Sequence, residues 1–270
     1  MKAQNLVRIF FVLISLNSLF MTAFSDVKIN DEKQKQIDPA FLNLSKKLPL
    51  PTYEPVKYRF DKIPWLTTEQ LSEHIELYKG YVKKENEIAK ALTTIDRSKA
   101  NGITYSEFRS LKLAETFAMN GDILHQLYFE NISDKQSITP GEQMMNFIIE
   151  AFGSLDAFKK DLFACATSSR GWVLTGYSLH DNRIHNFVLE AHNQTVPVLV
   201  MPLITLDVYE HAYFLDFGTK RPSYVDRFWN NINWNVVEER VNMWVNPLIK
   251  KCEETKNDSQ EKEKQSSTKK

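Results

Sequence analysis

The sequence predicts an α+β fold, in which an N-terminal antiparallel helical hairpin precedes a C-terminal α/β domain with a small three-stranded antiparallel sheet. Two observations predict this fold. Apolar residues recur at helical spacing in the first half of the chain, and short runs rich in Val, Ile, Leu and Phe, separated by turn residues, follow in the second half. With 270 residues, of which 43% are hydrophobic, the chain can bury a sizeable core.

Residues 1–25 predict a cleaved secretory signal peptide. Basic residues precede an apolar stretch from Ile9 to Phe24, and Ala23 and Ser25 place small side chains where a signal peptidase reads. An uncleaved anchor is the alternative, although the apolar run is short for a membrane span of roughly 20 residues. We therefore expect an exported protein, secreted, periplasmic or organellar, with no membrane segment after removal of the signal.

Composition divides the rest of the chain into four regions. Residues 26–50 are polar and aperiodic and predict a flexible linker, and residues 251–270 lack an apolar face and predict a disordered charged tail. Between them we expect a helical hairpin domain over 51–132 and an α+β domain over 133–250. Lys+Arg and Asp+Glu both number 34, so no net field attracts nucleic acid, and we expect no nucleic-acid partner.

Two long helices form the predicted hairpin. The first, over 67–93, begins at a capping box opened by Thr67 and has one apolar face. The second, over 106–129, follows an Asn-Gly turn and has an apolar face of its own. The short connection makes the two helices antiparallel neighbours.

Shorter elements are predicted in the α+β domain. They are helices over 143–152 and 154–168, strands over 172–178, 183–191 and 198–208, and a last helix over 222–244. The strands are rich in Val, Ile, Leu and Phe, which favour sheets. The last helix has Pro222 in its first turn, where proline is well tolerated.

An Asp and a His, Asp207 and His211, lie four residues apart at the end of the third predicted strand. A carboxylate and an imidazole held this close supply half of the coordination shell of a first-row metal ion. His74 and His125 lie on the apolar faces of the two hairpin helices and point at the partner helix. One such histidine is more often a hydrogen-bonded core residue, but two of them near the Asp–His pair predict a four-ligand metal site with a fifth position open.

These segments resemble the iron/manganese superoxide dismutases. The motif LDVYEHAY at residues 206–213 is similar to the signature of that family, and residues 66–74 and 120–125 look like the segments that carry its first two ligand histidines. The start of the sheet and the last helix are also similar, at residues 170–172 and 228–234. The resemblance extends over the folded region, from about Pro51 to Trp244.

The resemblance implies that His74, His125, Asp207 and His211 hold one manganese or iron ion per subunit, with a solvent molecule as the fifth ligand. It implies an oxidoreductase that converts superoxide, its small-molecule substrate, into dioxygen and hydrogen peroxide by redox cycling of that ion. No organic cofactor is expected.

The resemblance also implies a route for protons. Tyr81 matches the family's gateway tyrosine, although its spacing from the ligand histidine is one residue shorter than usual. The family's relay glutamine stands either at the position of Gly121 or in the loop before the third strand, which makes Gln194 the expected relay, a pattern more typical of manganese enzymes. His192 in the same loop is the alternative relay, as in an iron or cambialistic enzyme.

Other positions bear on the metal cavity and on a subunit interface. Trp172 is expected to wall the cavity, and Tyr209 replaces the family's usual Trp beside the metal. In the family, the counterpart of Glu210 reaches the ligand histidine of a second subunit, which predicts a homodimer. Tyr78 and Phe214 stand where a His and a Tyr are usual, so we expect the cross-subunit His–Tyr hydrogen bond to be absent.

Two other classes of function remain open at this point. A non-catalytic metal-binding or scaffold protein can share the fold, because fold does not dictate activity. A mononuclear metal hydrolase can use the same ligands, but it needs a general base, for which Tyr81 is the one candidate. The choice between manganese and iron, and between a dimer and a tetramer, is not decided by the residues.

Overall fold

The computed structural model describes residues 50–58, 60, 63–100, 102–132, 139–251 and 254. The predicted signal peptide, and all but the edges of the predicted linker and tail, lie outside these residues. Within the described part of the chain, no helix combines the length and the apolar character that a membrane crossing needs.

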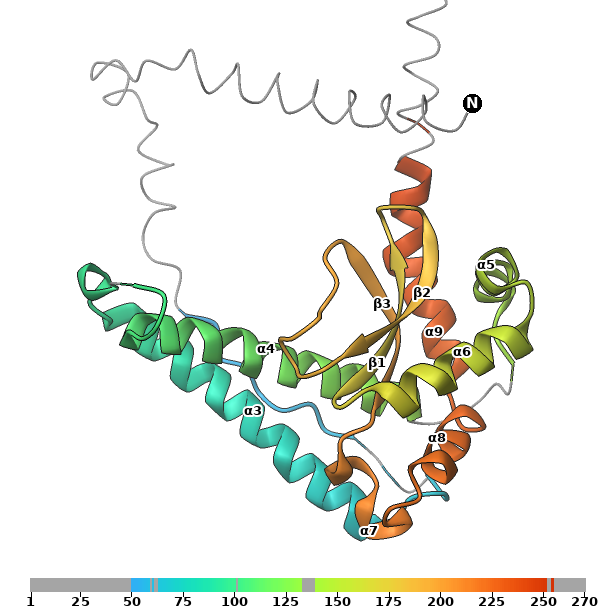
Figure 1. The fold of residues 1–270 in the computed structure, drawn as a ribbon, viewed down its shortest axis with the longest axis horizontal. Coiled ribbons are helices and arrows are strands. Elements are labelled where there is room, and N and C mark those ends of the chain that lie inside the picture. Colours follow the sequence, from blue (N-terminus) through green and yellow to red (C-terminus); the bar gives the residue numbers. More distant parts are fainter. Residues whose placement is uncertain are drawn as a thin grey trace, which may run out of the picture. The chain divides into compact units, whose positions relative to one another are not determined.

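Two long antiparallel helices, α3 (Thr68–Thr94) and α4 (Glu107–Ile132), form the predicted hairpin and lie side by side in Figure 1. Thr67 caps α3, because its side-chain oxygen accepts a hydrogen bond from the backbone N–H of Gln70. The 3-10 turn η2 (Arg97–Lys99) lies in the connection between the helices. The prediction is confirmed, with α4 continuing three residues beyond its expected end.

The predicted three-stranded antiparallel sheet is also confirmed. After α5 (Glu142–Phe152) and α6 (Leu155–Ser168), the strands are β1 (Trp172–Ser178), β2 (Arg183–Leu189) and β3 (Val200–Asp207). Their order is β2-β1-β3, and both pairings are antiparallel. Trp172 at the start of β1 pairs with Asp207 at the end of β3, so the sheet brings these two residues together.

The prediction of one helix over 222–244 is wrong. The segment contains α8 (Arg221–Trp229), α9 (Trp234–Arg240) and the π-helical turn η4 (Val241–Val245). The helix breaks before Asn233, whose backbone N–H donates instead to the carbonyl of Asn131 in α4, 2.7 Å away. Two short elements after β3 were not predicted, namely η3 (Glu210–Ala212) and α7 (Phe214–Phe217).

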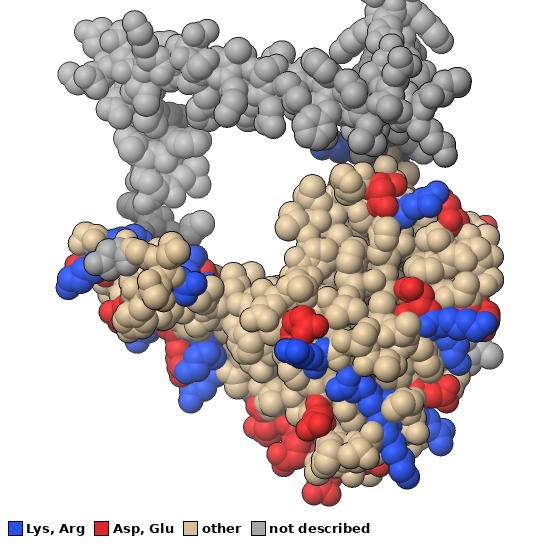
Figure 2. Space-filling view, in the orientation of Figure 1, with Lys and Arg blue, Asp and Glu red and all other residues tan. Residues whose placement is uncertain are grey.

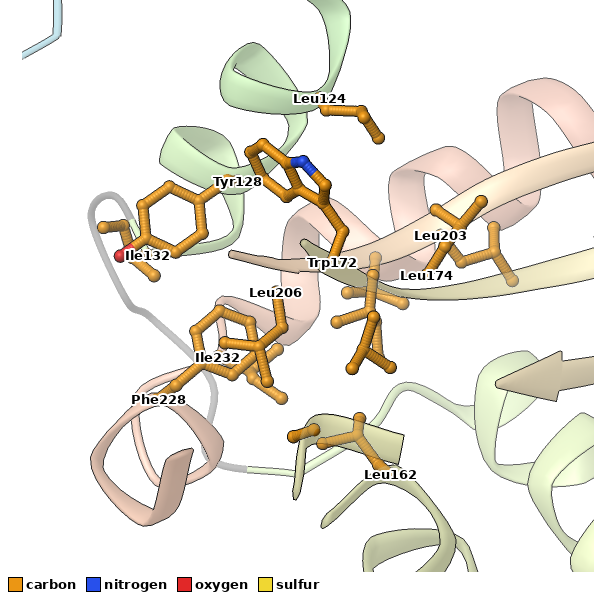
Figure 3. Packing of buried hydrophobic residues seen from close by; sticks show 14 of the residues in the cluster. Leu124, Tyr128, Ile132, Leu162, Trp172, Leu174, Leu203, Leu206, Phe228 and Ile232 are labelled. Atoms are coloured by element: carbon orange, nitrogen blue, oxygen red, sulfur yellow. The ribbon is translucent and has the colours of Figure 1, made fainter. Parts of the chain in front are cut away.

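One hydrophobic core joins the hairpin to the sheet. Figure 3 shows the indole of Trp172 near Leu124 and Tyr128 of α4, with Leu206 and Phe228 among the other packed residues. The described residues from Pro51 onward form a single compact unit, and the regions predicted over 51–132 and 133–250 share one core. On the face shown in Figure 2, basic and acidic side chains are interspersed, in keeping with their equal numbers.

Candidate metal centre

The four predicted ligand residues converge on one point. His74, His125, Asp207 and His211 each offer one ligand atom, and these atoms lie within 4.8 Å of one another. The Oδ2 atom of Asp207 is 3.2 Å from Nε2 of His74, 3.7 Å from Nε2 of His125 and 3.2 Å from Nε2 of His211. This spacing suits donors arranged around a single ion.

Each ligand comes from a different element. His74 lies on the buried face of α3, and His125 lies on the buried face of α4. Asp207 ends β3, and His211 follows on η3. The first three side chains are buried, whereas that of His211 is 26% exposed, so the centre lies close to the surface only at His211.

The donors fit a manganese or iron ion. The Nε2 atoms of His74 and His125 are buried and have no hydrogen-bond partner among the described residues, a costly arrangement unless something binds them. Nδ1 of His125 lies 2.5 Å from the carbonyl of Gly121 and donates to it, which leaves the Nε2 lone pair for a metal. The other oxygen of Asp207, Oδ1, accepts from the backbone N–H of Tyr209 at 2.9 Å. Three imidazole nitrogens and one carboxylate oxygen suit either ion.

Burial and charge set the protonation states of the ligands. Burial lowers the pKa of His74 and of His125 below the ordinary histidine value. Burial alone would raise the pKa of Asp207, but the interactions with His211 and His74 outweigh it and hold that pKa well below its usual range. Asp207 in turn raises the pKa of His211 against the effect of burial. Asp207 therefore stabilises the protonated form of His211. A metal cation bound in the centre would take the place of that proton.

A chain of hydrogen bonds runs beside the ligands. The indole N–H of Trp172 donates to Nδ1 of His192 at 2.9 Å. Because Nδ1 accepts, the hydrogen of the neutral imidazole lies on Nε2, from which it is donated to the hydroxyl oxygen of Tyr81 at 2.8 Å. The hydroxyl hydrogen of Tyr81 remains for donation into the centre, where its ring stacks on His125 with centroids 5.2 Å apart.

The pKa values of Tyr81 and His192 keep a proton on the tyrosine. Burial, helped by Asp207, raises the pKa of Tyr81 to about 12. Burial lowers the pKa of His192 to about 4. At neutral pH, Tyr81 therefore keeps its proton and His192 is uncharged, which agrees with the hydrogen-bond directions above.

The structure brings His192, and not Gln194, into contact with the Tyr81 hydroxyl. His192 is 1% exposed and bonded to Tyr81, whereas the Gln194 side chain is exposed and its amide is bonded to no described residue. Gln194 and Tyr81 both line an open pocket of about 650 Å³ outside the centre. Gly121 stands at the family's other relay position. It has no room for a side chain, because a Cβ atom there would lie 2.7 Å from the ring of Tyr81.

The remaining predicted positions divide between core and surface. The ring of Trp172 is perpendicular to that of His125, with centroids 5.0 Å apart, and the ring of Tyr209 stacks on that of His211 at 5.2 Å. Tyr78 is fully buried, and its hydroxyl accepts from the backbone N–H of Val56 at 3.0 Å. The segment around Val56 thus contacts the Tyr78 hydroxyl within the same subunit.

Glu210 lies where a subunit contact is possible. Its side chain is exposed, and among the described residues its carboxylate has no hydrogen-bond or ion-pair partner. It shares an open surface hollow with Arg170, Tyr209, His211 and Arg221. The Glu210 carboxylate is therefore accessible on the surface of this subunit.

Sequence reasoning missed two residues that hold the ligand segment in place. The buried amide of Gln70 donates to the carbonyl of His211 at 2.6 Å and accepts from the backbone N–H of Leu215 at 3.1 Å. The hydroxyl of Tyr224 donates to the carbonyl of Asp207 at 2.8 Å. The sequence places Gln70 in the first turn of the helix capped by Thr67, and nothing in it indicates that the side chain of Gln70 or Tyr224 reaches the ligand segment.

Comparisons with known proteins agree with this geometry. Residues 140–240 match the family described as iron/manganese superoxide dismutases, C-terminal domain. The superoxide dismutase (Fe) of Aquifex aeolicus is 44% identical over 179 residues, which cover 65% of this chain and 84% of that protein. The superoxide dismutase (Fe) of Methanothermobacter marburgensis is 33% identical over 189 residues, with coverages of 68% and 92%. The superoxide dismutase (Mn) of Mycobacterium intracellulare is 31% identical over 169 residues, with coverages of 62% and 80%. The chain thus belongs to the iron/manganese superoxide dismutase family, oxidoreductases that convert superoxide into dioxygen and hydrogen peroxide.

Proposed function

We propose that His74, His125, Asp207 and His211 together bind the single iron or manganese ion at which superoxide dismutation takes place. One observation carries this proposal, namely the two buried Nε2 atoms without a partner, which face one carboxylate oxygen and a third imidazole. When bound, such an ion supplies one-electron redox chemistry, so that two superoxide ions and two protons become dioxygen and hydrogen peroxide.

We further propose that Tyr81 holds one of the two protons that this reaction consumes. Its hydroxyl lies beside the ligands, and its pKa of about 12 keeps it protonated at neutral pH. His192 donates to the hydroxyl oxygen and so leaves the hydroxyl hydrogen directed away from itself. In this proposal His192, and not Gln194, is the relay residue that contacts Tyr81.

Iron is the metal that we propose. The expectation of manganese depended on Gln194 as the relay, and His192 occupies that place instead. The relative at 44% identity carries iron in its printed name, whereas the manganese-named relative is 31% identical. Elemental analysis of protein produced with both ions supplied tests this choice, and a manganese content well above that of iron would contradict it.

The direct test of the metal site uses the full chain and two histidine variants. We expect the wild type to contain close to one iron or manganese ion per subunit and to dismutate superoxide, and His125→Ala to lose both. His180→Ala is the matched control, because His180 is exposed at the turn after β1. Wild-type protein that stays metal-free when either ion is supplied would contradict the proposal and favour a scaffold. Ester or phosphoester hydrolysis without dismutation would favour the hydrolase.

We also propose a homodimer that covers His211. The exposed Glu210 carboxylate and the partly exposed His211 lie next to two apolar side chains, Phe214 and Leu215, which are 46% and 56% exposed. A second copy would bury these apolar groups. Sedimentation analysis tests this proposal: we expect Leu215→Lys to shift the protein toward monomer, and Ile103→Lys, at a position that is 90% exposed, to leave the assembly unchanged.

Export remains a proposal that the sequence alone supports. The basic start, the apolar stretch from Ile9 to Phe24 and the small residues after it fit a cleaved signal peptide. A mature N-terminus near Asp26 would support cleavage, and an intact Met1 in the exported protein would refute it.

A further inference from the structure

The loop that carries His192 has an unusual backbone. Ala191 to Gln194 form a tight turn, in which the N–H of Gln194 donates to the carbonyl of Ala191 at 3.3 Å. Thr195, the next residue, has a φ of 59°, which is unfavourable for a β-branched residue. Because the turn continues directly into this strained residue, the position of His192 needs support from outside the loop.

Hydrogen bonds within the loop hold Thr195 in that conformation. Its hydroxyl donates to the carbonyl of Val188 at 2.9 Å and accepts from the backbone N–H of Glu190 at 3.0 Å. These bonds tie the loop to the end of β2. They do not reach α4, where the metal ligand His125 lies.

Two asparagine side chains connect the loop to α4. The amide of Asn120 donates to the backbone carbonyl of His192 itself, at 2.8 Å. The amide of Asn193 lies 3.1 Å from the carbonyl of Leu113 and 3.0 Å from the hydroxyl oxygen of Thr116, and donates to both. His192 is thus held at its backbone by Asn120 and at its ring by Trp172.

We infer that Asn120 is a positioning residue for the dismutation reaction, because it fixes the backbone of His192 so that Nε2–H meets the hydroxyl of Tyr81. This inference rests on the proton-holding role proposed for Tyr81. Asn120 precedes the ligand His125 by five residues on the same helix, so the helix that places the ligand also places the relay. A shift of the relay relative to the ligands is thereby prevented.

The test replaces the donor of Asn120 in two ways. Asn120→Asp keeps the shape but turns the amide nitrogen into an acceptor, and Asn120→Leu keeps the size without adding charge. In the metal-loaded full chain, we expect either variant to lower kcat by about tenfold, because misplaced catalytic groups cost rate steeply. We expect kcat/KM to fall by less than about threefold, because proton delivery affects saturated turnover more than encounter with superoxide.

A crystal structure of the loaded variant supplies a readout that is independent of activity. We expect the distance from Nε2 of His192 to the hydroxyl of Tyr81 to exceed hydrogen-bond range, with the metal ligands unmoved. In a His192→Ala background, the additional loss from Asn120→Asp should disappear, because the two residues act through one another. A loss of ordinary structural origin would persist in that background.

Asn86→Asp is the matched control. The amide of Asn86 also donates to a backbone carbonyl in another segment, that of Tyr53, at 2.9 Å, but it lies on α3 away from His192. We expect its effect on kcat to stay below about twofold, as for most surface substitutions. Unchanged kcat in both Asn120 variants, or an unmoved His192, would overturn the inference while leaving the dismutase activity of the wild type intact. An inactive metal-loaded wild type would instead overturn the proposed function.

Discussion

The Nε2–H of His192 meets the hydroxyl oxygen of Tyr81 at 2.8 Å. The orientation is fixed from the other side of the ring, because the indole N–H of Trp172 can only donate and therefore requires Nδ1 as its acceptor. The three side chains come from β1, the loop after β2, and α3. Trp172 and His192, which are far from Tyr81 in the sequence, thus determine the direction in which the Tyr81 hydroxyl can donate its hydrogen.

The first prediction concerns the relay. We expect His192→Ala to lower kcat by about 10- to 100-fold, at or below the lower limit of about 100-fold for a lost proton-transfer group, because Tyr81 remains. The metal content should stay close to that of the wild type, because His192 is not one of the four clustered ligands. Stopped-flow measurement of superoxide decay, with elemental analysis of the same sample, checks both expectations.

Gln194→Ala is the control for that experiment, since its side chain is exposed in the same loop. We expect kcat to change by less than about twofold, as for other surface substitutions. If Gln194→Ala slows turnover as much as His192→Ala, the glutamine is the relay and the assignment to His192 is wrong.

The second prediction concerns Gly121. A Cβ atom there would lie 2.7 Å from the ring of Tyr81, so Gly121→Ala must displace the tyrosine. We expect the free energy of unfolding to fall by about 1–3 kcal/mol, the usual cost of overpacking, and kcat to fall with it. Gly80→Ala is the matched control on α3, because nothing lies within 4 Å of its Cβ position. It should stabilise the helix by about 0.5–1 kcal/mol, as chemical denaturation would show.

The third prediction concerns Gln70, which the sequence did not reveal as part of the centre. Gln70→Leu leaves the carbonyl of His211 and the N–H of Leu215 without their partner. We expect a loss of about 1–3 kcal/mol in stability, the cost of such unpaired groups, and faster loss of metal to a chelator. Gln70→Glu keeps the acceptor for Leu215 but turns a carboxylate oxygen toward the carbonyl of His211; because two acceptors repel, it should hold the metal no better than Gln70→Leu. Equal metal retention in all three proteins would contradict a role for Gln70 in holding His211.

Patterns that act within one element were predictable from the sequence. Helical spacing of apolar residues located α3 and α4, and with them the two histidines that face one another. The break at Asn233 was not predictable, because its cause is a hydrogen bond to Asn131, about a hundred residues earlier. The contact between His192 and Tyr81 was not predictable either, because His192 is held by Asn120 and Trp172, which are distant in the sequence.

The last prediction concerns the pH dependence of stability. Glu85 of α3 faces the buried Asp122 of α4, and burial, followed by that neighbouring carboxylate, raises the pKa of Glu85 to about 7. The folded state therefore binds this proton more tightly than the unfolded chain does. The resulting stabilisation is complete below the ordinary glutamate pKa and is lost as pH rises through about 7.

We therefore expect Glu85→Gln to raise the melting temperature relative to the wild type at pH 8 and to change it little at pH 5. The difference in unfolding free energy should be below about 1 kcal/mol, because water screens a partly exposed carboxyl. Glu87→Gln is the control on the same helix, since Lys84 lowers the pKa of Glu87 instead; it should not stabilise the protein at pH 8. A Glu85→Gln protein that gains as much at pH 5 as at pH 8 would show that the pKa of Glu85 is not raised in the folded state.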